Sequence, residues 1–244
     1  MLETNLDTAS IRQVIANLYK GAGINFPTST RPITSLGGLT GSLSLIWHEV
    51  PKLTSRSASE ILLQQGGLLN PLTEVNDEKL AGFMYANASC GAIFVEQGDR
   101  LTRRRFSAAH ELGHYLLHFI PLLEAAKETG EEELPELIDG LPITSEEAEP
   151  GTEFQEGIAL PTVTSGISAK LPTYEQMEHE ANEFAAEILM PEALIRELFQ
   201  NYSGRFQGRY LVRRLAADLL VSLSAMQWRL RKLGYLPPTT VQWN

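Results

Sequence analysis

The sequence has little cysteine, little histidine and no long apolar run. Of its 244 residues, one is cysteine (Cys90) and five are histidine. A lone cysteine excludes an intrachain disulfide framework and a zinc site built from cysteines. No apolar stretch approaches the length needed to span a bilayer, and the opening "MLETNLDTASIRQ" lacks the basic start and apolar core of a signal peptide. We therefore expect a soluble protein of the cytoplasm.

The charge of the chain is unevenly distributed. With 43% hydrophobic and 20% charged residues, the composition is that of an ordinary globular protein with one sizeable core. The net charge is −10, yet residues 191–244 carry eight Lys/Arg against three Asp/Glu. Residues 121–180 carry two lysines against fifteen acids. We expect this acid-rich stretch to be a solvated loop, and the alternative is an acidic lid over a cleft.

Apolar spacing predicts strands early in the chain and helices later. Strands are expected over 43–50, 82–86 and 91–96, and helices over 8–21, from about 103, from about 173 to 190, and over 191–202, 209–220 and 222–233. This order favours an α+β fold.

The stretch "SAAHELGHYLLH" (107–118) carries the strongest chemical pattern. Positions four apart lie on one face of a helix, so His110 and His114 can direct two imidazole nitrogens to one point, which is half of a tetrahedral zinc site. Glu111 lies about 100° around the helix, where it can contact a water that the metal activates. This is the HExxH arrangement, in which the glutamate takes the proton of that water.

Two features of this helix favour a metal over an ordinary pair of histidines. The motif lies in an apolar helix, where unpaired imidazoles would be costly to bury. Gly113 costs about 1 kcal/mol in a helix interior relative to alanine, and a close backbone approach to another element would explain it.

A catalytic metal needs a third protein ligand, with a fourth position left for water. The second long helix, "MEHEANEFAAEILMP", offers Glu178 or Glu180. We favour Glu178, because it shares the apolar stripe of Ala181 and Ala185 and can point inward. Asn182, one turn further on, is placed to hydrogen-bond a ligand. The other acids of this helix, Glu183 and Glu187, are expected to face solvent or form salt bridges.

Together, "FSAAHELGHYLLH" and "EHEANEFAAEILMP" resemble the ImmA/IrrE family of metallopeptidases. The resemblance extends to "GAIFVE" upstream and "LAADLLVSLSAMQWRLRKLGYL" near the end. It implies a zincin-like, gluzincin-type core in which His110, His114 and Glu178 bind the metal and Glu111 is the catalytic base. It further implies a cytoplasmic role and a protein substrate, a helix-turn-helix repressor in a stress or mobile-element response. The long acidic insertion departs from the family.

The donor set predicts the cofactor and leaves further site residues open. Two histidines and a glutamate suit Zn²⁺ best and also accept Mn²⁺ or Fe²⁺. A second donor to the developing oxyanion is expected, and the candidates are Tyr115, His118, Tyr174 and His179. For His118 the alternative is a polar residue near the helix end bonded to a carbonyl.

The strand "GAIFVE" has two interpretations. As a sheet edge it would bind the extended substrate through Gly91, Ile93 and Phe94. As an interior strand it would belong to the core.

The basic C-terminal segment supplies the alternative function. We expect residues 1–190 to form the metallopeptidase domain, with the acidic insertion at about 121–172, and 191–244 to form a helical, helix-turn-helix-like subdomain. Five basic residues of this segment are placed to neutralise phosphates: Arg213, Arg214, Arg229, Arg231 and Lys232. The chain would then be a DNA-binding regulator with a structural metal. The overall acidity argues against DNA contact, and we expect no membrane partner. The sequence does not indicate the oligomeric state.

Overall fold

A small mixed sheet lies between helices in the computed structural model, which describes residues 6–64, 77–131, 134–142 and 172–237. The four strands are β1 (Leu45–Val50), β2 (Leu80–Ala86), β3 (Gly91–Glu96) and β4 (Leu137–Pro142), in the order β1-β3-β2-β4. The helices are α1 (Thr8–Ala22), α2 (Leu36–Thr40), α3 (Ser55–Gln64), α4 (Leu101–His114), the π-helical turn η1 (Tyr115–Phe119), α5 (Ile120–Thr129), α6 (Tyr174–Leu189), α7 (Glu192–Ser203), α8 (Gly208–Leu219) and α9 (Leu223–Lys232). The α+β prediction is confirmed.

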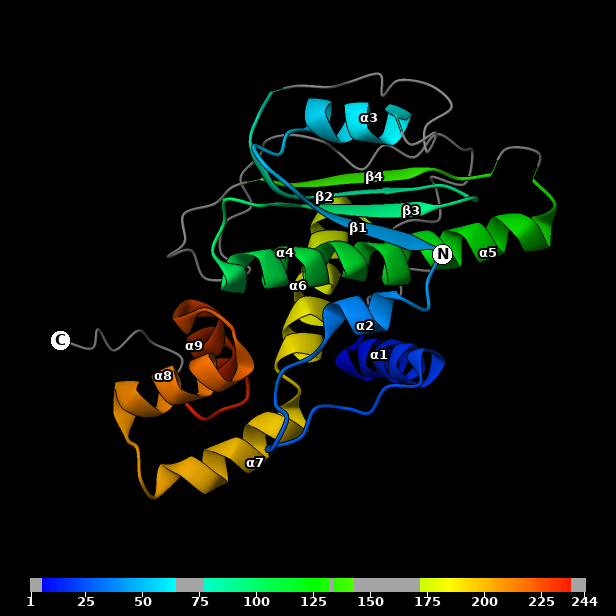
Figure 1. The fold of residues 1–244 in the computed structure, drawn as a ribbon. Helices are drawn as coiled ribbons and strands as arrows, with labels where there is room; N and C mark the ends of the chain where they lie inside the picture. Colours follow the sequence, from blue (N-terminus) through cyan, green and yellow to red (C-terminus); the bar gives the residue numbers. More distant parts are fainter. Residues whose placement is uncertain (1–5, 65–76, 132–133, 143–171, 238–244) are drawn as a thin grey trace.

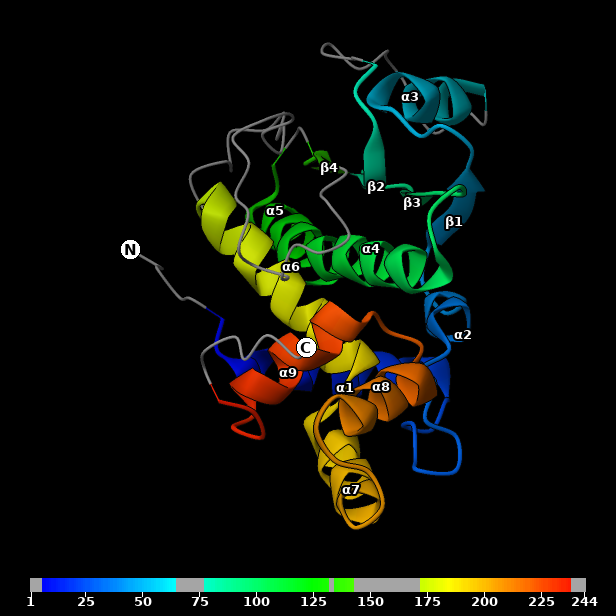
Figure 2. The same ribbon diagram turned by 90° about the vertical axis from the view of Figure 1, so that its left-hand side faces the viewer.

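The two faces of the sheet pack against different helices. On β2, Met84 faces the larger core, which includes residues of α4 and α6, while Phe83 faces a smaller core with α3. Figure 1 shows α3 on one face of the sheet and α4 on the other, and Figure 2 shows the sheet nearly edge-on between them. This alternation follows from the two-residue period of a strand.

Strand β3 is an interior strand. It pairs with β1 in parallel and with β2 antiparallel, so both of its backbone edges are occupied. The hypothesis that Gly91, Ile93 and Phe94 bind a substrate strand is therefore wrong, because these residues have no free edge and are buried. The sequence signal for an interior strand was the uninterrupted apolar run in "GAIFVE", because strands covered on both faces lack the alternation of apolar and polar residues.

The predicted acidic loop contains two ordered elements. Helix α5 buries Leu122, Leu123 and Ala126 along one face and ends at Gly130, whose φ of 69° is the left-handed conformation that glycine favours. Strand β4 then pairs antiparallel with β2. The expectation of a loop beginning at residue 121 is therefore wrong for these two elements. Residues 143–171 of the predicted insertion lie outside the described residues.

The C-terminal helices share their core with the rest of the molecule. Leu215 and Leu230 belong to the same buried cluster as Phe184 and Ile188 of α6. Helices α8 and α9 are joined by a tight turn at Leu220, whose φ is 50°. The division of the chain at residue 190 stays a prediction.

Two basic residues that were expected to face phosphates are engaged inside the protein. Arg229 is buried, donates to the carbonyl of Met190 and forms an ion pair with Glu187. Lys232 pairs with Glu183. Both glutamates form the expected salt bridges, but they are buried instead of facing solvent. Arg229 is therefore unavailable to DNA in this conformation.

None of the helices in the described part of the chain combines the length and apolar character that crossing a bilayer requires.

Candidate metal centre

Helix α4 directs two imidazoles to one point. His110 and His114 are fully buried, and their Nε2 atoms lie 3.0 Å apart. Helical spacing alone produces this approach, because residues four apart lie one turn above each other. Two ring nitrogens at this distance either share a proton in a hydrogen bond or face a common cation.

Helix α6 brings a carboxylate to the same point. The Oε1 atom of Glu178 lies 3.0 Å from Nε2 of His114, and Oε2 lies 3.4 Å from Nε2 of His110. The two helices can approach because of Gly113: a Cβ there would lie 3.1 Å from Cα of Ala181. The close backbone approach expected at Gly113 is confirmed.

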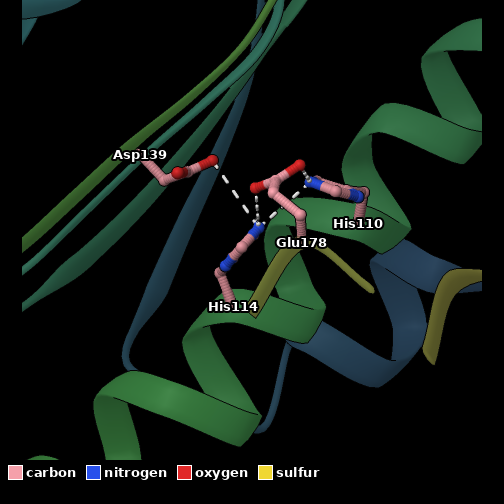
Figure 3. Close-up of side chains that lie close together, drawn as sticks. All are labelled: His110, His114, Asp139 and Glu178. Carbon is pink, nitrogen blue, oxygen red and sulfur yellow. Dashed lines mark hydrogen bonds and ion pairs between the residues drawn. The ribbon is translucent and has the colours of Figure 1, made fainter. Parts of the chain in front are cut away.

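A fourth candidate ligand, Asp139, comes from strand β4. Its Oδ2 atom lies 3.6 Å from Nε2 of His114, and Figure 3 shows the four side chains converging from α4, α6 and the sheet. One ligand atom from each of the four lies within 4.8 Å of all the others. The sequence prediction missed Asp139, since its position was expected in a loop. The available signal was the spacing of two between Leu137, Asp139 and Leu141, which places all three on one face of a strand.

The chemistry of these groups fits a divalent cation. Neither oxygen of the buried Asp139 carboxylate has a hydrogen-bond partner. Unsatisfied buried carboxylates are costly unless they are paired or coordinate a metal. Ligand bonds of about 2.0–2.2 Å imply about 3.3–3.6 Å between ligand atoms of a tetrahedral zinc site, and the observed separations of 3.0–3.6 Å lie close to this range. The cluster can therefore hold a metal.

The side chains of the cluster shift one another's pKa values. Burial lowers the pKa of His114, but Asp139 and Glu178 outweigh it and raise that pKa to about 9. Burial raises the pKa of Asp139 to about 6, against the opposing effect of His114. Burial also acts to raise the pKa of Glu178, but the two imidazoles lower it well below its ordinary value. Without a metal, the charge of His114 therefore partly balances the carboxylates around it.

Glu111 lies beside the cluster and not within it. It is fully buried, and neither carboxylate oxygen has a hydrogen-bond partner. Burial, followed by repulsion from Asp139, raises its pKa well above the ordinary value. A Cβ at Gly82 of β2 would lie 2.5 Å from Oε1 of Glu111. Gly82, which the sequence did not single out, therefore makes room for this carboxylate.

Both imidazoles are held through their second nitrogen. Nδ1 of His110 lies 3.2 Å from the side-chain oxygen of Asn182, as expected for a residue that orients a ligand. Nδ1 of His114 lies 3.1 Å from Nδ1 of His118, whose Nε2 lies 3.1 Å from Glu180. His118 is therefore bound to a histidine and a carboxylate, and not to a carbonyl as the alternative prediction had it.

The remaining candidates for the oxyanion donor differ in how near they lie to the cluster. Tyr174, one turn before Glu178, interacts with the Glu178 carboxylate. Burial and the carboxylates of Asp139 and Glu178 raise the pKa of its hydroxyl, which therefore stays protonated. The ring of Tyr115 instead stacks on Phe119 and closely approaches Gly91 of β3, away from the cluster. His179 is exposed on α6.

A helix bearing HExxH, with a carboxylate brought from a second helix, defines a metallopeptidase-type centre. The chain belongs to the peptidase family described as the IrrE N-terminal-like domain, which it matches over residues 72–134 and 164–231, more than half of its length. This is the family that the sequence resembles. No curated protein matches the chain. The match includes His110, Glu111, His114 and Glu178, whereas Asp139 lies between the two matched segments.

Proposed function

We propose that the chain is a metal-dependent endopeptidase that hydrolyses a peptide bond. The observation that carries the proposal is the position of Glu111, a buried carboxylate without a hydrogen-bond partner beside two imidazoles and Glu178. A purely structural site would have no use for an additional unpaired carboxylate, which is costly to bury.

His110, His114 and Glu178 would hold the cation, with Zn²⁺ the expected metal and Mn²⁺ or Fe²⁺ compatible with the same donors. When bound, the metal lowers the pKa of a water and polarises the scissile carbonyl. Glu111 accepts the proton of the attacking water and passes it to the leaving amine.

The hydroxyl of Tyr174 is the candidate donor to the oxyanion, since it stays protonated beside the carboxylates. For the extended substrate we propose pairing with β4, which replaces the β3 hypothesis. Within the described residues, β4 pairs only with β2 and so leaves one edge open next to the cluster. An extended peptide adds to a sheet at such an edge.

We extend the proposal to the substrate class on the resemblance alone. The substrate would be a helix-turn-helix transcriptional repressor, and the setting a stress or mobile-element response in the cytoplasm. Co-expression of the chain with such regulators, followed by mass spectrometry, should reveal a defined cleavage product.

A second candidate function has one observation in its favour. Four protein ligands in a buried cluster are typical of structural metal sites, so the chain could be a DNA-binding regulator without proteolytic activity. Salt-dependent binding of DNA in a filter assay would support it, and the ion pairs of Arg229 and Lys232 argue against it.

The test of the proposed function is the Glu111→Gln variant. Metal content measured on the purified protein should equal that of the wild type, while cleavage of a proteome-derived peptide mixture should disappear. Loss of metal together with cleavage would mean that Glu111 is structural and would contradict its role as the base.

A further inference from the structure

Asp139 is buried where its strand would otherwise carry an apolar residue. It lies in the middle of β4, opposite Met84 of β2, and is 1% exposed. The side chain two residues before it on the same face, Leu137, belongs to the main hydrophobic core. Apart from the imidazole of His114 at 3.6 Å, this carboxylate has no partner, and a bound cation would offset the cost of burying it.

With Asp139 counted, the protein supplies four candidate ligands, which is the number of a closed tetrahedral site. His110, His114 and Glu178 provide three protein ligands, which is the number that a catalytic zinc site uses while it keeps the fourth position open. The Asp139 carboxylate lies on the remaining side of the cluster, within 4.8 Å of the other three ligand atoms. It is thus in the place that the attacking water needs.

We propose that Asp139 is a fourth protein ligand that closes the metal site, so that the conformation described is a latent form of the enzyme. This proposal rests on the proposed function and adds its regulation. Activation then consists of withdrawing the Asp139 carboxylate, which opens the fourth position to water.

Strand β4 covers the catalytic base as well as the ligands. The backbone of Leu141, two residues along the strand from Asp139, lies close to the Glu111 carboxylate without forming a hydrogen bond of normal geometry. His110, Glu111 and His114 are all fully buried, and Glu178 is 9% exposed. In this conformation these groups are therefore closed to bulk water.

The position of β4 allows it to move without dismantling the sheet. In the described part of the chain it is an edge strand held by β2 alone, and a register irregularity occurs where it passes Leu80 and Gly82. A substrate strand added to its open edge would act directly on the element that carries Asp139. Asp139 itself lies between the two segments that match the family.

Cobalt spectroscopy of the full-length protein tests the proposal without relying on activity. The wild type and Asp139→Ala are loaded with Co²⁺ and titrated with acetohydroxamate, which binds a metal through an open position. The matched control is Asp218→Asn on α8. Asp218 pairs with Arg214 and lies far along the chain from Asp139.

We expect acetohydroxamate to change the visible spectrum of Asp139→Ala at concentrations at least tenfold lower than those needed for the wild type or the control. The affinity for Zn²⁺, measured by chelator competition, should fall at least tenfold in the same variant. Equal acetohydroxamate titrations in wild type and Asp139→Ala, with equal zinc affinity, would overturn the proposal. So would a variant that loses zinc affinity yet gains no response to acetohydroxamate, because the site would then be structural.

Thermal unfolding provides a measurement that does not depend on the alanine variant. Asp139→Asn keeps the shape of the side chain and removes its negative charge. The increase in unfolding temperature on adding zinc should be smaller than in the wild type. An unchanged zinc-induced increase would contradict ligation by Asp139.

The outcomes separate this proposal from the proposed function. If Glu178→Ala abolishes metal binding while Asp139→Ala leaves it unchanged, the latent form is wrong and the peptidase site stands. If the wild type binds no divalent metal, both proposals fail.

Discussion

His114 and His118 face each other through their Nδ1 atoms, 3.1 Å apart, directly after the HExxH motif. His118 lies in the π-helical turn η1, and such turns are frequent at functional sites. Burial lowers the pKa of His118 to about 4, so it is neutral near pH 7 and can accept a hydrogen bond at Nδ1 while donating from Nε2 to Glu180. Glu180 in turn accepts from the backbone of Leu6 and from Gln176. This series of hydrogen bonds fixes the nitrogen that His114 offers to a metal.

Replacing His118 should therefore weaken metal binding without removing a ligand. In His118→Phe we expect zinc affinity to fall by about 10- to 100-fold, the usual effect of losing a partner that orients a ligand. Chelator competition measures it, and His179→Phe, on the exposed face of α6, is the control. If the two variants bind zinc as tightly as the wild type, His118 does not position His114.

The same histidine should make the metal-free protein sensitive to acid. Its folded-state pKa of about 4 lies below the 6.5 of an unperturbed histidine, so the unfolded chain binds more protons as the pH falls through this range. The stability is present above about pH 6.5 and is lost towards pH 4. Between pH 7 and 5 the wild type should lose about 2 kcal/mol more stability to unfolding than His118→Phe. Urea denaturation in EDTA at both pH values measures this, and equal losses would refute it.

A methyl group at Gly82 should disable the base and leave the ligands in place. The added Cβ would lie 2.5 Å from Oε1 of Glu111, which must then move. We expect Gly82→Ala to keep its metal and to lose about 100-fold or more in kcat/KM, the scale of general acid-base catalysis. The control is Gly21→Ala, where a Cβ meets no atom within 4 Å. Unchanged cleavage in the Gly82 variant would show that the position of Glu111 is unimportant.

Arg229 should stabilise the junction between α9 and α6. It is buried, paired with Glu187 and bonded to the carbonyl of Met190. Removing one partner of a buried ion pair costs about 3–5 kcal/mol when the other charge is left alone. Glu187 keeps a second partner in Arg12, so Arg229→Met should lower the free energy of unfolding measurably, but by less than this amount, in urea denaturation. Arg213→Met, which is exposed on α8, should change it little. A similarly small effect at both positions would mean that Arg229 does not anchor α9 to α6, and it would support the DNA-binding hypothesis.

The sequence predicts those parts of the site that depend on spacing within one helix. His110, Glu111 and His114 share α4, and helical geometry fixes their relation before any packing is known. Glu178 could be favoured because its stripe of alanines predicts the buried side of α6. Most helix and strand positions follow from the same periodicity, including the α1 cap at Asp7, which accepts from the backbone of Ser10.

Relations between strands could not be predicted in this way. An apolar run such as "GAIFVE" does not reveal which strands flank it, so the interior position of β3 depends on pairing across the whole sheet. Asp139 was missed because Asp, Gly and Pro are depleted in strands and the flanking sequence is rich in glutamate. Tertiary pairing with β2 overrides these local preferences. Gly82 was missed because the contact that requires glycine comes from α4.

The central claim is that the imidazoles of His110 and His114 and the carboxylate of Glu178 bind one divalent cation. Anomalous diffraction at the zinc edge from crystals of the zinc-loaded protein tests it most directly. We predict a single strong peak about 2.0–2.2 Å from Nε2 of both histidines and from an oxygen of Glu178. Stoichiometric zinc with its anomalous peak elsewhere, while these three side chains keep their positions, would contradict the account.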